Sequence, residues 1–308
     1  MTVPAPENDA PEPAWTGPAR TMAWLLRAVG LLPLRWAHAL GSVLGELVYL
    51  VHGRTRRTVD TNLHLCFPEL DAGTRSRLAH QTMRETGKAL LELGAIWDWP
   101  AERVRRLFVE TEGEALLAAA RERGQGVLIA APHLGCWEMT SHYAQLHGYQ
   151  LTALYRPPRQ QTLGPLVRAR RQRFGAQLVP TDAGGIKALL RALKRGECVG
   201  ILPDQDAGHD GAMAPFFDVP ASTMTLFARL ARRSQATLLI AFAERRAGGS
   251  FRLHLRPLPD AAADSDPRVA ATALNEAIEA CVRERPAQYQ WTYRRFKTRP
   301  QDTAPRYN

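Results

Sequence analysis

A short apolar segment that leads directly into a histidine-bearing turn constrains the fold of this 308-residue chain most strongly. Residues 127–131 form a continuous apolar run after two glycines, which is the pattern of a strand buried on both faces. Pro132 ends that run, and residues 134 to about 147 have the composition of a helix. The sequence therefore predicts that His133 lies on a turn between a buried strand and a helix.

Glu138 follows His133 by five residues. Five residues of regular helix correspond to about 500° of rotation, so the two side chains meet only if His133 precedes the helix and folds back over its first turn. A carboxylate that accepts from one imidazole nitrogen leaves the other nitrogen to act as a general base. We therefore predict that Glu138 holds His133, which deprotonates a substrate hydroxyl. On spacing alone the alternative stands equally: His133 caps the helix and Glu138 favours its positive end.

Apolar strands alternate with amphipathic helices along most of the chain. Further strands are predicted at residues 151–155, 177–180, 198–202, 236–243 and 251–256, and helices at 72–97, 114–123, 163–174, 186–194, 222–233 and 268–285. This alternation predicts an α/β fold, a mixed sheet flanked by helices, with active groups at strand ends. His133 and Asp204 each come just after a predicted strand. That agreement is the best internal evidence for a site.

The N-terminal region reads differently from the rest. Residues 1–20 are rich in proline and predict a disordered tail, 21–58 a membrane-associating helix, 59–300 the catalytic domain and 301–308 a C-terminal tail. Segment 21–58 lacks the roughly 20 uninterrupted apolar residues of a spanning helix. Its apolar face precedes three arginines suited to anionic headgroups, so we expect it to lie in or partly through the cytoplasmic face of a membrane. An ordinary core helix is the alternative. The apolar residues are Leu40, Val43, Leu44, Leu47, Val48 and Val51, and the arginines Arg54, Arg56 and Arg57.

Positive charge is concentrated after the predicted turn. The chain carries a net charge of +10, and the span between Glu138 and Asp182 contains arginines but no acidic residue. The planar guanidinium suits phosphate, so this span predicts contact with a phosphorylated ligand. A solvated helix face is the alternative, which we prefer for Arg168 and Arg170; Arg156, between a strand and two prolines, fits it less well. Nucleic acid is disfavoured as a partner because no helix-turn-helix, zinc-finger or RNA-binding signature accompanies the charge.

The sequence contains no spacing typical of a metal site or of a disulfide framework. Asp204 and Asp206 lack the glycine and terminal glutamate of a calcium loop, and the residues around His133 have no zinc-site spacing. We expect no metal and no cofactor, and expect Asp204 to pair with an arginine such as Arg171. The four cysteines lie far apart, which is typical of reduced thiols in the cytosol.

Several motifs, taken in order, resemble the late acyltransferases of lipid A biosynthesis, the lauroyl/myristoyl transferase family of Gram-negative inner membranes. The resemblance covers roughly residues 22–300. Its motifs are NLHLCFPEL at 62–70, the His133-x4-Glu138 box, YRP at 155–157, RQRFG at 171–175, LPDQD at 202–206, PFF at 215–217 and QWTYRRFKTRP at 290–300. The chain departs from the family at Asp218, where glycine is common.

The resemblance implies a glycerolipid-acyltransferase-like fold and an activity. The implied reaction transfers a lauroyl or myristoyl chain from acyl carrier protein to a hydroxyl on a 3-hydroxyacyl chain of Kdo-lipid IVA, at the cytoplasmic face of the inner membrane. The catalytic pair of the family falls on His133 and Glu138. The functional arginine of the family falls in the run from Arg170 to Arg173, where we choose Arg171, and its aspartate falls on Asp204. With Arg156 and Arg173 these two residues form the substrate-binding set that we expect.

The oxyanion of this reaction needs hydrogen-bond donors, for which we expect the backbone amides at Leu134 and Gly135, with Arg171 as another candidate. Two other functions remain open. One is an acyltransferase acting on a glycerolipid or ornithine lipid, and the other is a basic, membrane-associated binding protein without catalysis.

Overall fold

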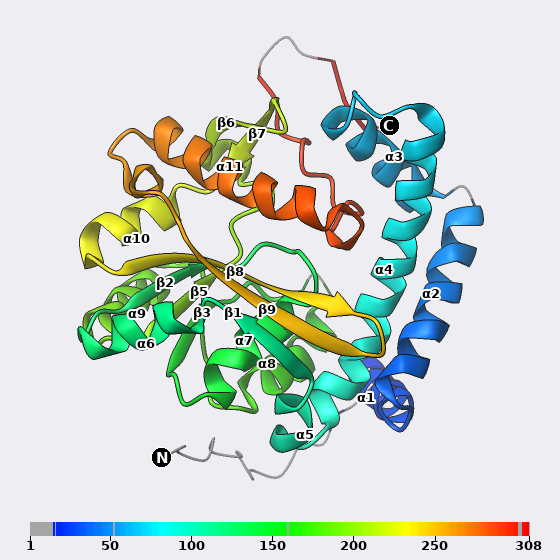
Figure 1. Cartoon of the computed structure of the whole chain (residues 1–308), viewed down its shortest axis with the longest axis horizontal. Coiled ribbons are helices and arrows are strands. Elements are labelled where there is room, and N and C mark those ends of the chain that lie inside the picture. The colour runs from blue at the N-terminus through cyan, green and yellow to red at the C-terminus, as the bar shows by residue number, and fades with distance from the viewer. Residues whose placement is uncertain (1–14, 16, 52, 159, 301–303, 308) are drawn as a thin grey trace.

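The structure is a computed structural model that describes residues 15, 17–51, 53–158, 160–300 and 304–307. A mixed seven-stranded sheet forms its centre, and helices cover both faces (Figure 1). The strand order is β1-β9-β8-β2-β5-β3-β4, and all neighbours pair in parallel except β8 and β9. The sheet strands are β1 (Phe108–Glu112), β2 (Val127–Ala130), β3 (Leu151–Leu154), β4 (Gln177–Val179), β5 (Cys198–Ile201), β8 (Thr237–Arg246) and β9 (Ser250–Pro257). The predicted α/β class with a mixed sheet is confirmed.

Alternate residues of the central strands enter two separate cores, as the two-residue period of a strand requires. In β2, Leu128 and Ala130 pack on one face, whereas Val127 and Ile129 pack on the other. The first face is covered by α9 (Ala183–Lys194), α10 (Leu226–Ser234) and α11 (Pro267–Glu284). The second is covered by α6 (Glu114–Glu122), α7 (Trp137–Leu146) and parts of the N-terminal helices, with α5 (Ala101–Arg105) at its margin. This double cover explains why β2 is apolar at every position.

Four N-terminal helices gather at one side of the sheet (Figure 1). They are α1 (Gly17–Gly30), α2 (Leu34–Leu50), α3 (Arg54–Cys66) and α4 (Ala72–Asp98). Segment 21–58, predicted as one helix, thus contains most of α1, all of α2 and the start of α3. Pro33 precedes α2 and Gly53 precedes α3, so both residues lie at helix boundaries. No described helix is long and apolar enough to cross a membrane.

Small residues let α2 lie directly against α4. A Cβ atom added at Gly41 or Gly45 would collide with backbone atoms of Gly87 or Met83 on α4. The larger apolar residues of α2 consequently point away from the protein: Leu40, Val43, Leu44, Leu47 and Val48 are all exposed. Their outward direction leaves a continuous apolar face without an intramolecular partner among the described residues.

The NLHLCFPEL motif begins within α3, where the Asn62 side chain is buried and donates to the carbonyl oxygens of Trp291 and Tyr293. Elsewhere the structure departs from the elements predicted from the sequence. The helix predicted to start at residue 222 begins at Leu226, because a hairpin of β6 (Ala212–Phe216) and β7 (Val219–Thr223) precedes it. Strand β1 was also missed. Residues 1–14 of the predicted tail lie outside the described residues, whereas Tyr307 of the C-terminal tail contacts Asn62.

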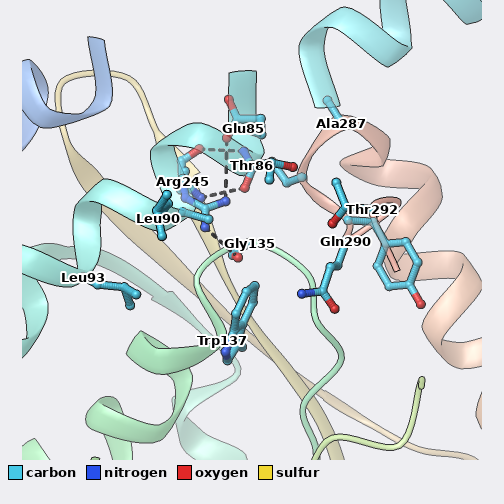
Figure 2. A pocket seen from close by; sticks show the side chains of 13 residues that line it. Glu85, Thr86, Leu90, Leu93, Gly135, Trp137, Arg245, Ala287, Gln290 and Thr292 are labelled. Carbon is cyan, nitrogen blue, oxygen red and sulfur yellow. Dashed lines mark hydrogen bonds and ion pairs between the residues drawn. The ribbon is translucent and has the colours of Figure 1, made fainter. Parts of the chain in front are cut away.

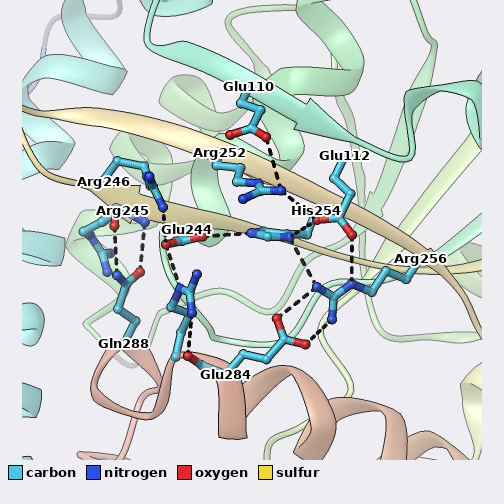
Figure 3. A network of polar contacts seen from close by, with 11 residues as sticks. Glu110, Glu112, Glu244, Arg245, Arg246, Arg252, His254, Arg256, Glu284 and Gln288 are labelled. Carbon is cyan, nitrogen blue, oxygen red and sulfur yellow. Dashed lines mark hydrogen bonds and ion pairs between the residues drawn. The ribbon is translucent and has the colours of Figure 1, made fainter.

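A polar network fastens the C-terminal end of α11 to the β1–β9–β8 side of the sheet (Figure 3). His254 lies between two carboxylates, with Nδ1 2.8 Å from Glu112 Oε2 and Nε2 2.9 Å from Glu244 Oε2. Arg285, just past α11, pairs with Glu244 at 2.7 Å. Three residues later, Gln288 accepts the backbone N–H of Arg245 and donates to its carbonyl oxygen. The network therefore holds the loop that runs beside residues 133–135.

Candidate active site

Strand register brings the two strand-end residues together. Ala130 of β2 and Ile201 of β5 are partners in adjacent parallel strands. His133 and Asp204 each lie three residues beyond these partners, at the same edge of the sheet. Parallel strands present their carboxyl ends together, so the two side chains project into one space. The two residues predicted to follow strands therefore lie side by side at the carboxyl ends of adjacent parallel strands.

Asp204 holds His133 through two hydrogen bonds, one to the imidazole and one to the backbone. Its Oδ1 lies 2.8 Å from His133 Nδ1, and its Oδ2 accepts the backbone N–H of His133 at 2.8 Å. Asp204 is buried, and although burial raises the pKa of its carboxyl, attraction to His133 and these hydrogen bonds lower that pKa below its usual value. An ionised Asp204 accepts only, so Nδ1 carries the proton and Nε2 presents its lone pair.

Two glutamines complete the surroundings of His133. The amide nitrogen of Gln205 lies 3.2 Å from His133 Nε2 and also donates to Gln290 Oε1 at 3.0 Å. The backbone N–H of Gln290 donates to the carbonyl oxygen of His133 at 3.0 Å. The Trp137 ring lies 5.2 Å from the imidazole, centroid to centroid. Neither glutamine was predicted as a site residue, although Gln205 directly follows Asp204 in the LPDQD motif and Gln290 begins the QWTYRRFKTRP motif.

Glu138 contacts an arginine and not His133. It lies in the first turn of α7, buried, and accepts from Arg171 Nε at 2.8 and 3.2 Å. Burial raises the pKa of the Glu138 carboxyl, but the attraction and hydrogen bonds of Arg171 lower it below its usual value. The predicted contact between Glu138 and His133 is therefore replaced by two separate pairs. The expected pairing of Asp204 with Arg171 is also wrong. Asp204 pairs with His133, and Arg171 pairs with Glu138.

The remaining arginines of this region have different surroundings. Arg171 and Arg170 lie on α8 (Gly164–Gln172), where Arg170 is buried and pairs with Asp98 at 2.7 Å. The solvated face expected for Arg170 is thus wrong. Arg173 donates to the carbonyl oxygen of Trp97 at 2.5 Å, so both residues bind the end of α4. Arg156 is exposed on the loop after β3.

The backbone amides predicted as oxyanion donors are already occupied. Leu134 N–H donates to the carbonyl oxygen of Pro132 at 2.7 Å, and Gly135 N–H donates to that of Gln288 at 3.0 Å. Gly135 has a φ of +61°, and a Cβ there would collide with the carbonyl oxygen of Ala243. Glycine is therefore required where the turn crosses β8. The prediction of free amides at this turn is wrong.

A cavity of about 200 Å³ opens beside the turn (Figure 2). Arg245 forms part of its wall, where Glu92 accepts from its Nε at 2.8 Å and from its Nη2 at 2.6 Å, and Nη2 also donates to the carbonyl oxygen of Gly135 at 2.8 Å. Most of the remaining wall is apolar. The lining residues are Glu85, Thr86, Ala89, Leu90, Leu93, Gly135, Trp137, Arg245, Ala287, Gln288, Tyr289, Gln290 and Thr292. Across the described chain, no three His, Cys, Asp or Glu side chains are grouped to hold a metal ion.

The chain is similar to known proteins over most of its length. A family model described as bacterial lipid A biosynthesis acyltransferase matches residues 15–298. The chain is 33% identical over 265 residues to the lipid A biosynthesis palmitoleoyltransferase of Escherichia coli, covering 85% of each chain. It is 29% identical over 299 residues to the lauroyltransferase of the same organism, covering 94% of this chain and 96% of that protein. The myristoyltransferase is 24% identical over 289 residues, covering 93% of this chain and 87% of that protein.

Proposed function

Because the chain belongs to the family of bacterial lipid A biosynthesis acyltransferases, we propose that it transfers a lauroyl or myristoyl chain from acyl carrier protein to Kdo-lipid IVA. The acceptor is a hydroxyl on a 3-hydroxyacyl chain of that lipid. The family membership supports an acyltransferase acting in lipid A biosynthesis. The donor, the chain length and the acceptor are the specific parts of the proposal.

The observation that carries the proposal is the Asp204–His133 pair. Asp204 fixes the imidazole with Nδ1 protonated, so Nε2 is the basic nitrogen. Nε2 faces the glutamine pair, beside a largely apolar cavity. A hydroxyl placed at Nε2 loses its proton to His133 as its oxygen attacks the thioester carbon. Asp204 stabilises the imidazolium that forms, the role first predicted for Glu138.

The same histidine then completes the transfer. When the tetrahedral intermediate collapses, the C–S bond breaks and the carrier thiolate leaves. The proton on His133 Nε2 passes to that sulfur, which gives ester and free thiol and restores the neutral imidazole. No other acid is needed, so the two predicted strand-end residues suffice for the proton transfers.

The arginines are proposed to contact the phosphates of the lipid. The Arg171 side chain keeps 31% of its surface exposed, and Glu138 fixes its orientation through Nε and Nη2. Arg156 is exposed on the loop after β3, and Arg173 is half-buried at the end of α8, two residues after Arg171. Glu138 then acts through Arg171, as a positioning residue. Asp204 acts through His133 and not on the substrate, which changes its expected role from binding to orientation.

The cavity beside Gly135 is proposed to hold the acyl chain of the donor. Ala89, Leu90 and Leu93 of α4 provide apolar wall, and Trp137 lies between this wall and His133. A chain lying there places its thioester at the His133 end. Hydrocarbon burial against such a wall contributes roughly 0.8 kcal/mol for each methylene, enough to distinguish chain lengths.

The outward face of α2 is proposed to lie on the cytoplasmic surface of the inner membrane. Its exposed leucines and valines would enter the interfacial region, and Arg54, Arg56 and Arg57 at the start of α3 would meet anionic headgroups. The net charge of +10 favours both an acidic carrier protein and a phosphorylated lipid.

A direct test incubates the purified protein in detergent with Kdo-lipid IVA and with lauroyl- or myristoyl-loaded acyl carrier protein. Mass spectrometry of the lipid should show the gain of one acyl chain, which His133→Ala should abolish. His64→Ala, at an exposed histidine of α3, is the matched control and should retain activity. If an acyl chain is added only to a glycerolipid or ornithine lipid, that lipid replaces Kdo-lipid IVA as the acceptor. If no lipid is acylated, the result favours a binding protein without catalysis.

A further inference from the structure

Acyl transfer through a tetrahedral intermediate requires a donor for the developing oxyanion, and this donor must lie close to His133 Nε2. The attacking oxygen and the oxyanion are bonded to the same carbon, so a group next to the base is next to both. Donors aimed at this position typically contribute 10²- to 10³-fold to kcat. The candidate donors near His133 can therefore be compared one by one.

Most of the nearby donors are committed elsewhere. The N–H groups of Leu134 and Gly135 are bonded to backbone carbonyl oxygens within the turn. The Cys136 N–H donates to the carbonyl oxygen of Ala243 at 2.8 Å. Arg171 donates to Glu138 through both Nε and Nη2. Breaking any of these would disturb either the turn that carries His133 or a buried ion pair.

The amide of Gln205 differs because its partner must change during the reaction. One of its N–H groups points at His133 Nε2 at 3.2 Å, and the other donates to Gln290 Oε1 at 3.0 Å. A substrate hydroxyl can reach Nε2 only by taking the place of the first N–H. That N–H is then released within reach of the reacting carbon, while Gln290 still holds the second.

We propose that Gln205 is a catalytic residue whose amide N–H binds the thioester carbonyl oxygen as negative charge develops there. Gln290 is a positioning residue, which keeps the Gln205 amide in place through Oε1. Figure 2 shows the Gln290 amide nitrogen on the side of Trp137, so the glutamine pair lies at the boundary of the cavity assigned to the acyl chain. This inference rests on the proposed acyl transfer.

The atoms balance with Gln205 acting only as a donor. The hydroxyl oxygen bonds to the thioester carbon, its proton moves to His133 Nε2, and the carbonyl π electrons move to the oxygen that Gln205 binds. The C=O bond then forms again, the C–S bond breaks, and the sulfur receives the proton from His133. Gln205 returns to Nε2 once the ester product leaves, so it is not consumed or ionised.

Gln205→Met tests the proposal, because methionine has a similar length but no N–H group. Gln125→Met, at an exposed glutamine before β2, is the matched control. Wild type, both variants and His133→Ala are compared in the acyl transfer assay, with KM for donor and lipid, the pH profile of kcat and the thermal midpoint recorded. Gln205→Ala provides a second variant if the methionine variant melts early.

We expect kcat of Gln205→Met to fall about 100-fold at every pH, with KM values and thermal midpoint close to those of wild type. The acidic limb of the pH profile should stay in place, since His133 remains held by Asp204. A kcat within about threefold of wild type, or a loss confined to KM or to a displaced acidic limb, overturns the role of Gln205 while leaving the transfer reaction standing. An inactive wild type instead overturns the proposed function, and this inference falls with it.

Discussion

The carboxylate of Glu138 accepts a hydrogen bond from Arg171 Nε at 2.8 Å, across 33 residues of sequence. The carboxylate that holds the imidazole of His133 instead comes from Asp204, 71 residues away. The histidine box therefore contains one member of each of two hydrogen-bonded pairs. We therefore expect substitutions of Glu138 and Asp204 to have different effects, although the sequence alone does not distinguish their roles.

Asp204→Asn is expected to lower kcat by about 10⁴-fold, because an asparagine NH₂ directed at Nδ1 favours the tautomer that leaves no lone pair on Nε2. Glu138→Gln should cost much less in kcat and act mainly on KM for the lipid, through Arg171. Steady-state kinetics on both variants, with thermal midpoints as the folding control, make the comparison. Equal losses in kcat would mean that Glu138 acts directly on His133.

His142 predicts an acid-sensitive stability. It is fully buried in α7, and among the described residues neither ring nitrogen has a hydrogen-bond partner. Burial lowers the pKa of its imidazole from 6.5 to about 4 in the folded protein. The unfolded chain therefore binds a proton that the folded chain does not between those values, so the free energy of unfolding decreases as the pH falls through that window, by about 3 kcal/mol.

His142→Phe should remove this sensitivity, since phenylalanine is similar in shape and does not titrate. Urea unfolding at several pH values from 7 to 4 measures the effect as the difference between variant and wild type. Parallel curves for the two proteins would contradict the assignment. Burial raises the pKa of the Glu92 carboxyl, but attraction to Arg245 and the hydrogen bonds from His38 and Arg245 lower it to about 2. Glu92 should therefore contribute equally to the pH dependence of unfolding in both proteins.

Because α2 and α4 are in direct backbone contact, we expect one methyl group added at a glycine of α2 to destabilise the protein. Gly45→Ala places a Cβ against the Met83 carbonyl, so the helices must separate, at about 1–3 kcal/mol of unfolding free energy. Gly53→Ala is the control, because nothing lies within 4 Å of its added Cβ. Thermal melting of both variants provides the measurement. Equal midpoints would show that α2 and α4 adjust without cost.

If the apolar face of α2 contacts the membrane, charged side chains introduced on that face should weaken the binding of the protein to lipid vesicles. Leu44→Glu combined with Leu47→Glu should weaken sedimentation with phosphatidylglycerol vesicles and leave the thermal midpoint unchanged, since both leucines are exposed. Val109→Glu, at an exposed apolar residue of β1, is the control and should bind normally. Full binding by the double variant would exclude this face as the contact.

Neutralising Arg54, Arg56 and Arg57 tests the electrostatic part of the same hypothesis. We expect weaker binding to anionic vesicles and a smaller dependence of binding on salt, because fewer charges meet the headgroups. Activity on membrane-embedded lipid should fall in parallel. Unchanged association and activity would count against a role for these arginines at the membrane.

Local sequence was sufficient to predict most of the elements and to place His133 and Asp204 just after strands. The apolar run before Pro132 becomes β2, and His133 lies on the turn before α7, because strand and helix periodicity depend on neighbouring residues. Segment 21–58 was predicted as one helix, although Pro33 and Gly53 lie at the boundaries that divide it into parts of three helices. The β6–β7 hairpin was missed because Ser222 and Thr223 precede a helical pattern without a clear stop.

Which side chains meet was decided by tertiary structure. Glu138 lies near His133 in sequence, yet α7 begins at Trp137 and directs Glu138 towards Arg171 on α8. Asp204 reaches His133 because β5 is the parallel neighbour of β2, and the glutamine pair forms because the loop after α11 returns beside the same turn. The order of strands in the sheet and the path of the loop after α11 depend on packing between residues far apart in the sequence. Residue types and spacing thus determined the chemistry available to this protein, whereas only the fold assigned each group its partner.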